Sequence, residues 1–215
     1  MIKGVIKLYI ERWDFFLELL LQHIVMTLVS VVIITILGLG LGILMTKNTW
    51  VASILLVVTN FLYTIPSIAL FGILVTISGI GNKSAIIALI IYGLLPMIRN
   101  TYVGIKEVDP QIIESAIGMG STELQLLYRI QLPQALPVIM SGFRTMVIMT
   151  IALGGIASFI GAGGLGVAIY RGISTYFPEM IVAGSLLVAF LAIGVDAFLQ
   201  KVEQAMTRKV LGRSR

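Results

Sequence analysis

IVMTLVSVVIITILGLGLGILM, from Ile24 to Met45, is a continuous apolar stretch without a single charged residue. About 20 consecutive apolar residues, wound as an α-helix, span the hydrocarbon core of a bilayer. A soluble domain is usually about half apolar and a quarter charged, whereas this chain is 58% hydrophobic and 12% charged. The stretch therefore predicts a transmembrane helix, with lipid as the solvent for much of the chain.

Four further apolar stretches follow along the chain. We expect Pro66 to kink the first of them and Pro96 to bend the second. The last two each contain one charged residue near an end, Arg144 and Asp196, and these two side chains are candidates for a pair. The sequence thus predicts an all-α integral membrane protein with about five transmembrane helices, in a transmembrane domain over residues 23–200. The four stretches are Val51–Ile77, Ala85–Ile98 with an extension to Tyr102, Val138–Ile160 and Met180–Leu199.

Residues 1–22 form a different kind of segment, in which apolar residues recur at spacings of three and four and charges fill the remainder. This periodicity predicts an amphipathic helix. We expect it to lie in the membrane interface, with Trp13 at headgroup depth. A solvated helix that leans on another subunit is the alternative. The recurring apolar residues are Ile2, Ile6, Tyr9, Trp13, Phe16 and Leu20.

The distribution of lysine and arginine predicts the orientation of the chain. Five spans place the two ends on opposite sides of the membrane, and cytoplasmic segments carry the excess of positive charge. The sequence therefore predicts an external N-terminus and a basic cytoplasmic tail over residues 201–215. The cations on the predicted inner side are Lys47, Arg99, Lys106, Arg129, Lys201, Arg208, Lys209, Arg213 and Arg215, against Lys3, Lys7, Arg12, Lys83 and Arg171 outside.

The loop over about 106–134 is predicted to be cytoplasmic and structured. Asp109 can cap a helix that has Pro110 at its first position. Gly118 and Gly120 then interrupt this helix. Ser121 can cap a second helix, with Glu123 in its first turn, and Pro133 and Pro137 mark its exit. A simple connector needs no such structure, so we expect a docking element.

The same loop carries a motif with a defined spacing. Glu114-Ser115-Ala116 is followed after three residues by Gly120, and after nine more by Ile130-Gln131-Leu132-Pro133. This resembles the EAA loop of ABC importer permeases, with Ser115 in place of the first alanine. The resemblance implies that the short helix sits in a groove of a cytoplasmic ATPase subunit; the alternative is an ordinary amphipathic loop helix. The predicted coupling residues are Glu114, Ser115, Ala116, Gly118, Gly120, Ile130, Leu132 and Pro133.

Three more blocks extend the resemblance over most of the chain: residues 63–67 (YTIPS), 95–102 (LPMIRNTY) and 159–166 (FIGAGGLG). All three are similar to permeases of glycine betaine, carnitine and choline importers, and the last is also similar to methionine importer permeases. The resemblance implies a multi-pass permease of the cell membrane that is not itself an enzyme. It further implies a second permease subunit, an external substrate-binding protein and two ATPase subunits, which bind the ATP and Mg that this chain does not.

Two groups of residues are candidates for the transport path. Asn60, Tyr63 and Ser67 are spaced for one face of the second span, and Tyr92 lies in the middle of the third. A quaternary ammonium has no N–H to donate, but aromatic faces attract it through cation–π interactions. Packing against neighbouring helices is the alternative role for these four residues.

Glycines mark two other features. Gly161, Gly163, Gly164 and Gly166 form an outer turn after the fourth span, which we expect to bend as the path opens. Their spacing matches the dinucleotide fingerprint formally, but that fingerprint needs a βαβ unit, and here a membrane span precedes it. Gly38 and Gly42 share one helical face and predict a close helix contact. The lone histidine, His23, is interpreted as an interfacial polar residue.

Composition limits the other functional classes. The chain has no cysteine and one histidine, which argues against a metal cluster, and no basic patch is interleaved with aromatics as nucleic-acid binding would require. A membrane-embedded protease or acyltransferase would need a nucleophile paired with a base, and a channel would need no docking loop. The preferred function is an osmoprotectant importer permease, with a methionine-type permease as the alternative.

Overall fold

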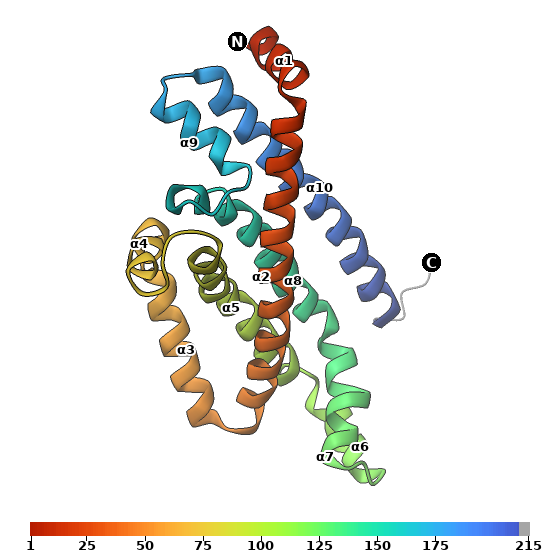
Figure 1. Ribbon diagram of the computed structural model, residues 1–215. Helices are drawn as coiled ribbons and strands as arrows, with labels where there is room; N and C mark the ends of the chain where they lie inside the picture. Colours follow the sequence, from red (N-terminus) through yellow and green to blue (C-terminus); the bar gives the residue numbers. More distant parts are fainter. Residues whose placement is uncertain (211–215) are drawn as a thin grey trace.

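The computed structural model describes residues 1–210, and every regular element in that part of the chain is a helix (Figure 1). This confirms the all-α prediction. Four helices are long and apolar enough to cross a membrane, or five if the bent pair α3–α4 counts as one span. The helices are α1 (Ile2–Glu11), α2 (Trp13–Lys47), α3 (Thr49–Thr64), α4 (Ser67–Ser78), α5 (Asn82–Lys106), α6 (Pro110–Gly118), α7 (Glu123–Leu126), α8 (Leu132–Gly154), α9 (Gly166–Ser174) and α10 (Pro178–Val210), with a π-helix at Leu127–Gln131 and a 3₁₀ turn at Ala157–Ile160.

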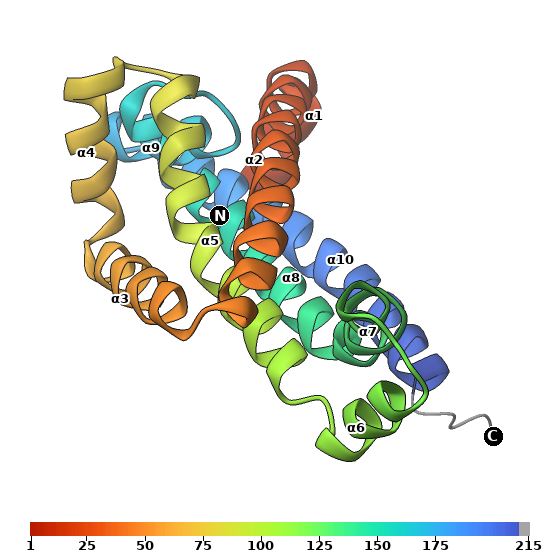
Figure 2. The ribbon, with the colours of Figure 1, turned by 90° about the horizontal axis from the view of Figure 1, so that it is seen from below.

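The second predicted span is broken rather than kinked. α3 and α4 meet at an angle of 100° (Figure 2). Ile65 is extended, with ψ of 127°, because a residue that precedes proline is restricted to extended conformations. Pro66 also has no N–H with which to continue the helix. The prediction of one helix with a proline kink was therefore wrong at this point.

The predicted N-terminal helix is divided in the structure. α1 ends at Glu11, Arg12 leaves the helical region with φ −129° and ψ 33°, and residues 13–22 belong to α2, the first span. Val5 and Leu8 are buried in a cluster with residues of α10, and the Tyr9 hydroxyl donates to the Ala183 carbonyl at 2.7 Å. Burial raises the pKa of the Tyr9 phenol.

Close packing of α2 on α5 forms the centre of the bundle. A Cβ added to Gly38 would lie 2.5 Å from Cγ of Met97, and one added to Gly42 would lie 2.5 Å from Cβ of Thr101. Larger side chains at these two positions would force the helices apart, so the predicted glycine face is confirmed as a helix contact. The α2–α5 pair positions α8, which packs against both helices.

α8 and α10 are joined by an ion cluster. The Arg144 guanidinium donates to both oxygens of Asp196, at 2.5 and 2.9 Å, and to Glu203 at 3.1 Å. The candidate pairing of Arg144 with Asp196 is confirmed, and Glu203 is an additional partner one to two helical turns further along α10. The three side chains are only 22–33% exposed, so the cluster fixes where α10 crosses α8.

Candidate functional sites

The short helix α6 begins as its sequence predicts. The Asp109 side chain accepts a hydrogen bond from the Gln111 backbone N–H at 2.8 Å, and Pro110 occupies the first turn. The Asp109 side chain satisfies one of the N–H groups that lack a partner at a helix start, and Pro110 has no N–H that would need one. α6 lies at the opposite end of the bundle from α1 (Figure 1), so the motif-bearing segment projects away from the N-terminal side.

Gly120 reverses the chain after α6. Its φ of +85° lies in the left-handed region, which glycine adopts without steric cost. The reversal is closed by backbone hydrogen bonds from Gly120 to Ile117 at 2.9 Å and from Ser121 to Ala116 at 3.1 Å. Ala116 is buried, whereas Glu114 and Ser115 point to the exposed side of α6. The turn thus leaves the polar half of the motif on the exposed surface.

The cap of the next helix differs from the prediction by one residue. Thr122, not Ser121, is the N-cap of α7: its hydroxyl accepts from the Gln125 N–H at 3.3 Å, while the Gln125 side chain accepts from the Thr122 N–H at 3.0 Å. This reciprocal capping box requires a glutamine or glutamate three residues after the cap. Gln125 satisfies this requirement for Thr122, whereas Leu124 cannot for Ser121.

The loop also does not end where its prolines suggested. α7 continues through the π-helix into α8. The helical segment Glu123–Gly154 is long and apolar enough to cross a membrane as one span. Pro133 lies in the first turn of α8, directly after the π-helix, and Pro137 lies inside α8. The predicted exit at these prolines was wrong. Ile130, Leu132 and Pro133 instead lie in the half-buried stretch where the loop continues into the fourth span.

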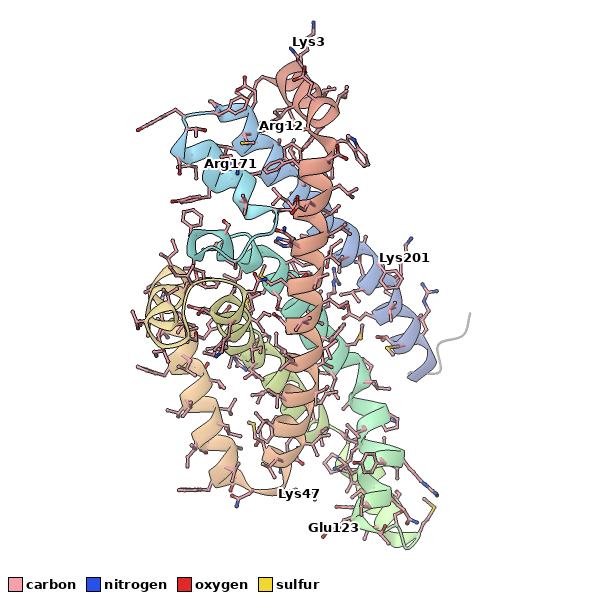
Figure 3. The ribbon with its side chains drawn as sticks, in the orientation of Figure 1. Lys3, Arg12, Lys47, Glu123, Arg171 and Lys201 are labelled. Carbon is pink, nitrogen blue, oxygen red and sulfur yellow. The ribbon has the colours of Figure 1, made fainter. Side chains whose placement is uncertain are left out.

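The loop exposes large apolar side chains at the end of the bundle. Met119 is 79% exposed, Leu124 66%, Tyr128 60% and Ile117 56%. A contiguous set of such side chains is typical of a protein interaction surface. Next to it, the ends of α2 and α5 enclose a cavity of about 510 Å³ with the α7 segment, lined among others by Lys47 and Glu123 (Figure 3).

The candidate path residues are only partly brought together. The Tyr63 and Tyr92 rings pack edge to face with centroids 5.9 Å apart, and the Tyr63 hydroxyl reaches Sδ of Met149 on α8 at 3.5 Å. The Tyr92 hydroxyl donates to the Ile65 carbonyl, which the break before Pro66 leaves without a helical partner. Tyr92 therefore supports the break, while Tyr63, 46% exposed, is free to present its ring.

The other two candidates do not share the expected face. Asn60 is exposed on α3. Ser67, however, begins α4 on the other side of the 100° bend, so the predicted common face of Asn60, Tyr63 and Ser67 does not form. Helical spacing applies only within one continuous helix, and the break at Ile65–Pro66 interrupts it.

The glycine turn at residues 161–166 is a packed joint in this structure. Gly161, Gly163 and Gly164 have φ values of +75°, +77° and +76°. Gly166 begins α9 instead, where an added Cβ would collide with the Gly155 carbonyl oxygen. Between them, Ala162 is 5% exposed and Leu165 is fully buried. Three of the four glycines are thus required by backbone conformation and the fourth by close approach.

His23 lies beside this turn, inside the protein. It is fully buried, and its Nε2 is 3.1 Å from the Ile151 carbonyl oxygen at the end of α8. The neighbouring Gln22, which sequence reasoning missed, accepts a hydrogen bond from the Gly164 N–H at 3.1 Å. The sequence did not indicate this burial, because the partners of His23 lie more than 120 residues away in the chain. Its position at the membrane interface stays a prediction.

These features define a class of protein: an α-helical membrane protein with a capped helix–turn–helix loop that continues into one of its spans. Residues 34–208 match the family described as "Binding-protein-dependent transport system inner membrane component". The chain belongs to this family, and it is the permease subunit of an ABC importer. This confirms the resemblance carried by the loop motif and places the chain in the cell membrane as a multi-pass protein.

Individual relatives cover nearly the whole chain. It is 39% identical over 194 residues to "Carnitine transport permease protein OpuCB" of Listeria monocytogenes, covering 90% of this chain and 89% of that protein. It is 38% identical over 190 residues to "Glycine betaine/carnitine/choline transport system permease protein OpuCB" of Bacillus subtilis (strain 168), covering 88% of each. In the solved structure of the inward-facing MetNI methionine ABC transporter, one chain superposes with a TM-score of 0.82 at 22% identity, covering 90% of this chain and 96% of that one. The last likeness concerns the fold alone.

Proposed function

We propose that this chain forms the translocation path of an importer for quaternary ammonium osmoprotectants such as glycine betaine, carnitine and choline. The observation that supports this substrate class is the identity of 38–39%, over almost the full length, to permeases named for these compounds. The half-exposed Tyr63 ring beside Tyr92 is consistent with it, because a quaternary ammonium is held by aromatic faces and not by hydrogen bonds.

Uptake by cells with and without the gene tests the substrate class. Labelled glycine betaine, carnitine, choline and methionine are each offered to a deletion strain, to the same strain with the gene restored, and to a strain that carries the Glu114→Lys variant as an inactive control. Restoration of uptake for at least one quaternary ammonium, but not for methionine, is expected. Restoration of methionine uptake alone would replace this proposal with the methionine-type alternative.

Coupling to ATP hydrolysis is assigned to the α6 segment. We propose that Glu114, Ser115, Ala116, Gly118 and Gly120 dock in a groove of a separate ATPase subunit, which binds ATP and Mg. The exposed apolar side chains beside α6 support this proposal, since they would be buried by such a partner. The complete importer would contain two permease subunits, two ATPases and an external binding protein. Co-purification of an ATPase with the tagged permease from detergent extracts tests the assignment.

The orientation proposed for the chain places α6 and the C-terminus in the cytoplasm and the N-terminus outside. The excess of lysine and arginine on the side of α6 supports it. Under this orientation, the glycine turn at residues 161–166 lies at the outer end of the path and acts as its gate. An epitope tag placed after Arg215 should be inaccessible in intact cells and accessible after permeabilisation.

A further inference from the structure

Two consecutive residues of α2 hold the segment that joins α8 to α9. The Gln22 side-chain oxygen accepts from the Gly164 N–H at 3.1 Å, and its amide nitrogen donates to Glu18 at 3.1 Å. The second bond fixes the orientation of the amide, because only its nitrogen can donate to a carboxylate. The oxygen therefore faces the glycine turn, and α2 and the turn are connected by a directed hydrogen bond.

His23 caps the end of α8 from the side. In a continuing α-helix the Gly155 N–H would bond to Ile151, but here it donates to Ala152 instead, at 3.2 Å. The Ile151 carbonyl is satisfied by His23 Nε2 at 3.1 Å. A carbonyl only accepts, so Nε2 carries the ring proton and Nδ1 is an acceptor. Among the described residues, nothing donates to this buried Nδ1.

The glycine turn lies directly against these two side chains. A Cβ added to Gly163 would be 2.6 Å from the Gln22 side-chain oxygen, and one added to Gly164 would be 3.1 Å from His23 Nδ1. Gly154, at the end of α8, approaches the same ring, since its Cβ would be 3.1 Å from Cε1. Glycine at these positions thus permits a contact that any other residue would obstruct.

We propose that Gln22 and His23 are positioning residues that latch the outer glycine turn, residues 161–166, onto α2 in this conformation. The inference deepens the proposed gating role of the turn and rests on it for its place in transport. The latch is complete on one side and incomplete on the other: Gln22 makes its bond to Gly164, whereas His23 Nδ1 lacks a donor. When the turn moves away from α2, water can reach Nδ1 and donate to it. This new hydrogen bond offsets part of the free energy needed to open the joint.

A single cysteine reports the state of the latch, because the chain contains none of its own. Ala162 is 5% exposed and sits within the turn, without the positive φ of its glycine neighbours. In an Ala162→Cys protein, labelling by a membrane-impermeant maleimide measures how often the turn leaves α2. Ser174→Cys, at an exposed position of α9, serves as the always-accessible reference.

Three changes open the latch from different sides. Gln22→Met keeps the length of the side chain and removes the acceptor, His23→Phe keeps the ring and removes Nε2–H, and Gly164→Ala pushes the turn outward. Each should raise the labelling rate of Ala162→Cys about tenfold, the effect expected for loss of one hydrogen bond. Glu18→Gln is the matched control: it keeps an oxygen that accepts from the Gln22 amide, leaves the bond from Gly164 to Gln22 intact, and should leave labelling close to the parent rate. Ser174→Cys should label equally in every background.

Unchanged labelling of Ala162→Cys in all three variants, with Ser174→Cys reactive, would overturn the latch and leave ordinary packing. Should one variant fail to reach the membrane, the other two decide the result. Uptake is measured separately in the same strains. Faster labelling with unaltered uptake would support the latch while removing the gating role of the turn, so failure of the inference and failure of the proposed function give different results.

Discussion

Two glycine turns stand at opposite ends of the fourth span and differ in their surroundings. At the docking end, Gly120 has φ +85°, and a Cβ added there would meet no atom of the described chain within 4 Å. At the outer end, Gly164 has φ +76°, and its Cβ would meet the ring of His23 at 3.1 Å. The same backbone conformation thus produces an open surface at one end and a packed joint at the other.

The contrast separates two reasons for glycine. At Gly120 only the backbone angle requires it, and the space beside it is left for a partner. At Gly163 and Gly164 neighbouring atoms crowd the position of a side chain as well, and at Gly166 the neighbouring atoms alone exclude one. Because the two turns are connected by one helical segment, Glu123–Gly154, we expect a displacement of the docking loop to be transmitted along it to the outer joint.

The largest expected effect is at the docking end. Glu114→Lys replaces an attraction with a repulsion at the proposed ATPase interface, and like charges in contact cost several kcal/mol, or roughly 100-fold or more in association. Gly120→Val adds a β-branched side chain at a positive φ. Uptake of labelled substrate should fall to background in both variants, while membrane abundance stays normal and ATPase co-purification weakens.

A charge reversal at the opposite end controls for this experiment. Asp14 is exposed near the start of α2, so Asp14→Lys makes the same change of charge away from α6 and should retain uptake. Wild-type uptake in both docking variants at normal abundance would refute the assignment of α6 as the coupling helix. Abundance is quantified by immunoblot in every strain, since loss of the subunit from the membrane would mimic loss of coupling.

A pair of glycine-to-alanine changes tests the packing contrast through stability. Gly166→Ala would drive a Cβ into the Gly155 carbonyl oxygen, whereas Gly118→Ala, at the end of α6, would meet no atom of the described chain within 4 Å. Overpacking of this kind costs about 1–3 kcal/mol, while alanine in a helix is favoured over glycine by about 0.5–1 kcal/mol. In detergent, the melting temperature of Gly166→Ala should therefore be lower than that of the parent protein. The melting temperature of Gly118→Ala should not be lower. Equal melting temperatures would contradict the packed description of the outer joint.

A smaller difference is expected between two glycines with the same φ. Alanine at either Gly120 or Gly164 is strained by the left-handed conformation, at about 1–2 kcal/mol. Only Gly164→Ala also presses on a neighbour, His23. Its melting temperature should be the lower of the two, and the gap between them measures the contact alone. A Gly120→Ala protein as unstable as Gly164→Ala would mean that backbone strain accounts for both positions.

Patterns among residues close together in the sequence predicted much of this molecule. Contacts between residues far apart in the chain were not predicted. The apolar runs, the Asp109 cap and the Gly38–Gly42 face each depend on residues within a few positions of one another, and all three are present in the structure. The cap at Thr122 was missed by one residue, because Ser121 offers the same hydroxyl and only Gln125 distinguishes them. The Tyr92 hydroxyl that satisfies the Ile65 carbonyl at the 100° bend lies 27 residues further along the chain, and the sequence around Pro66 does not contain that information.

The smallest effect is expected at Tyr63, which lies between the two ends and contacts Met149 in the middle of α8. Tyr63→Leu removes the aromatic face, and a cation–π contact at a partly exposed site is worth about 0.5–1 kcal/mol. The apparent KM for a quaternary ammonium substrate should rise roughly two- to fivefold, the concentration ratio that corresponds to this energy. Tyr63→Phe retains a ring and loses only the hydroxyl that faces Met149, so its KM should remain near the parent value. If both variants raise KM equally, the hydroxyl matters and the ring does not, and Tyr63 is a packing residue of the break rather than a part of the path. If neither does, the path passes elsewhere between the two turns.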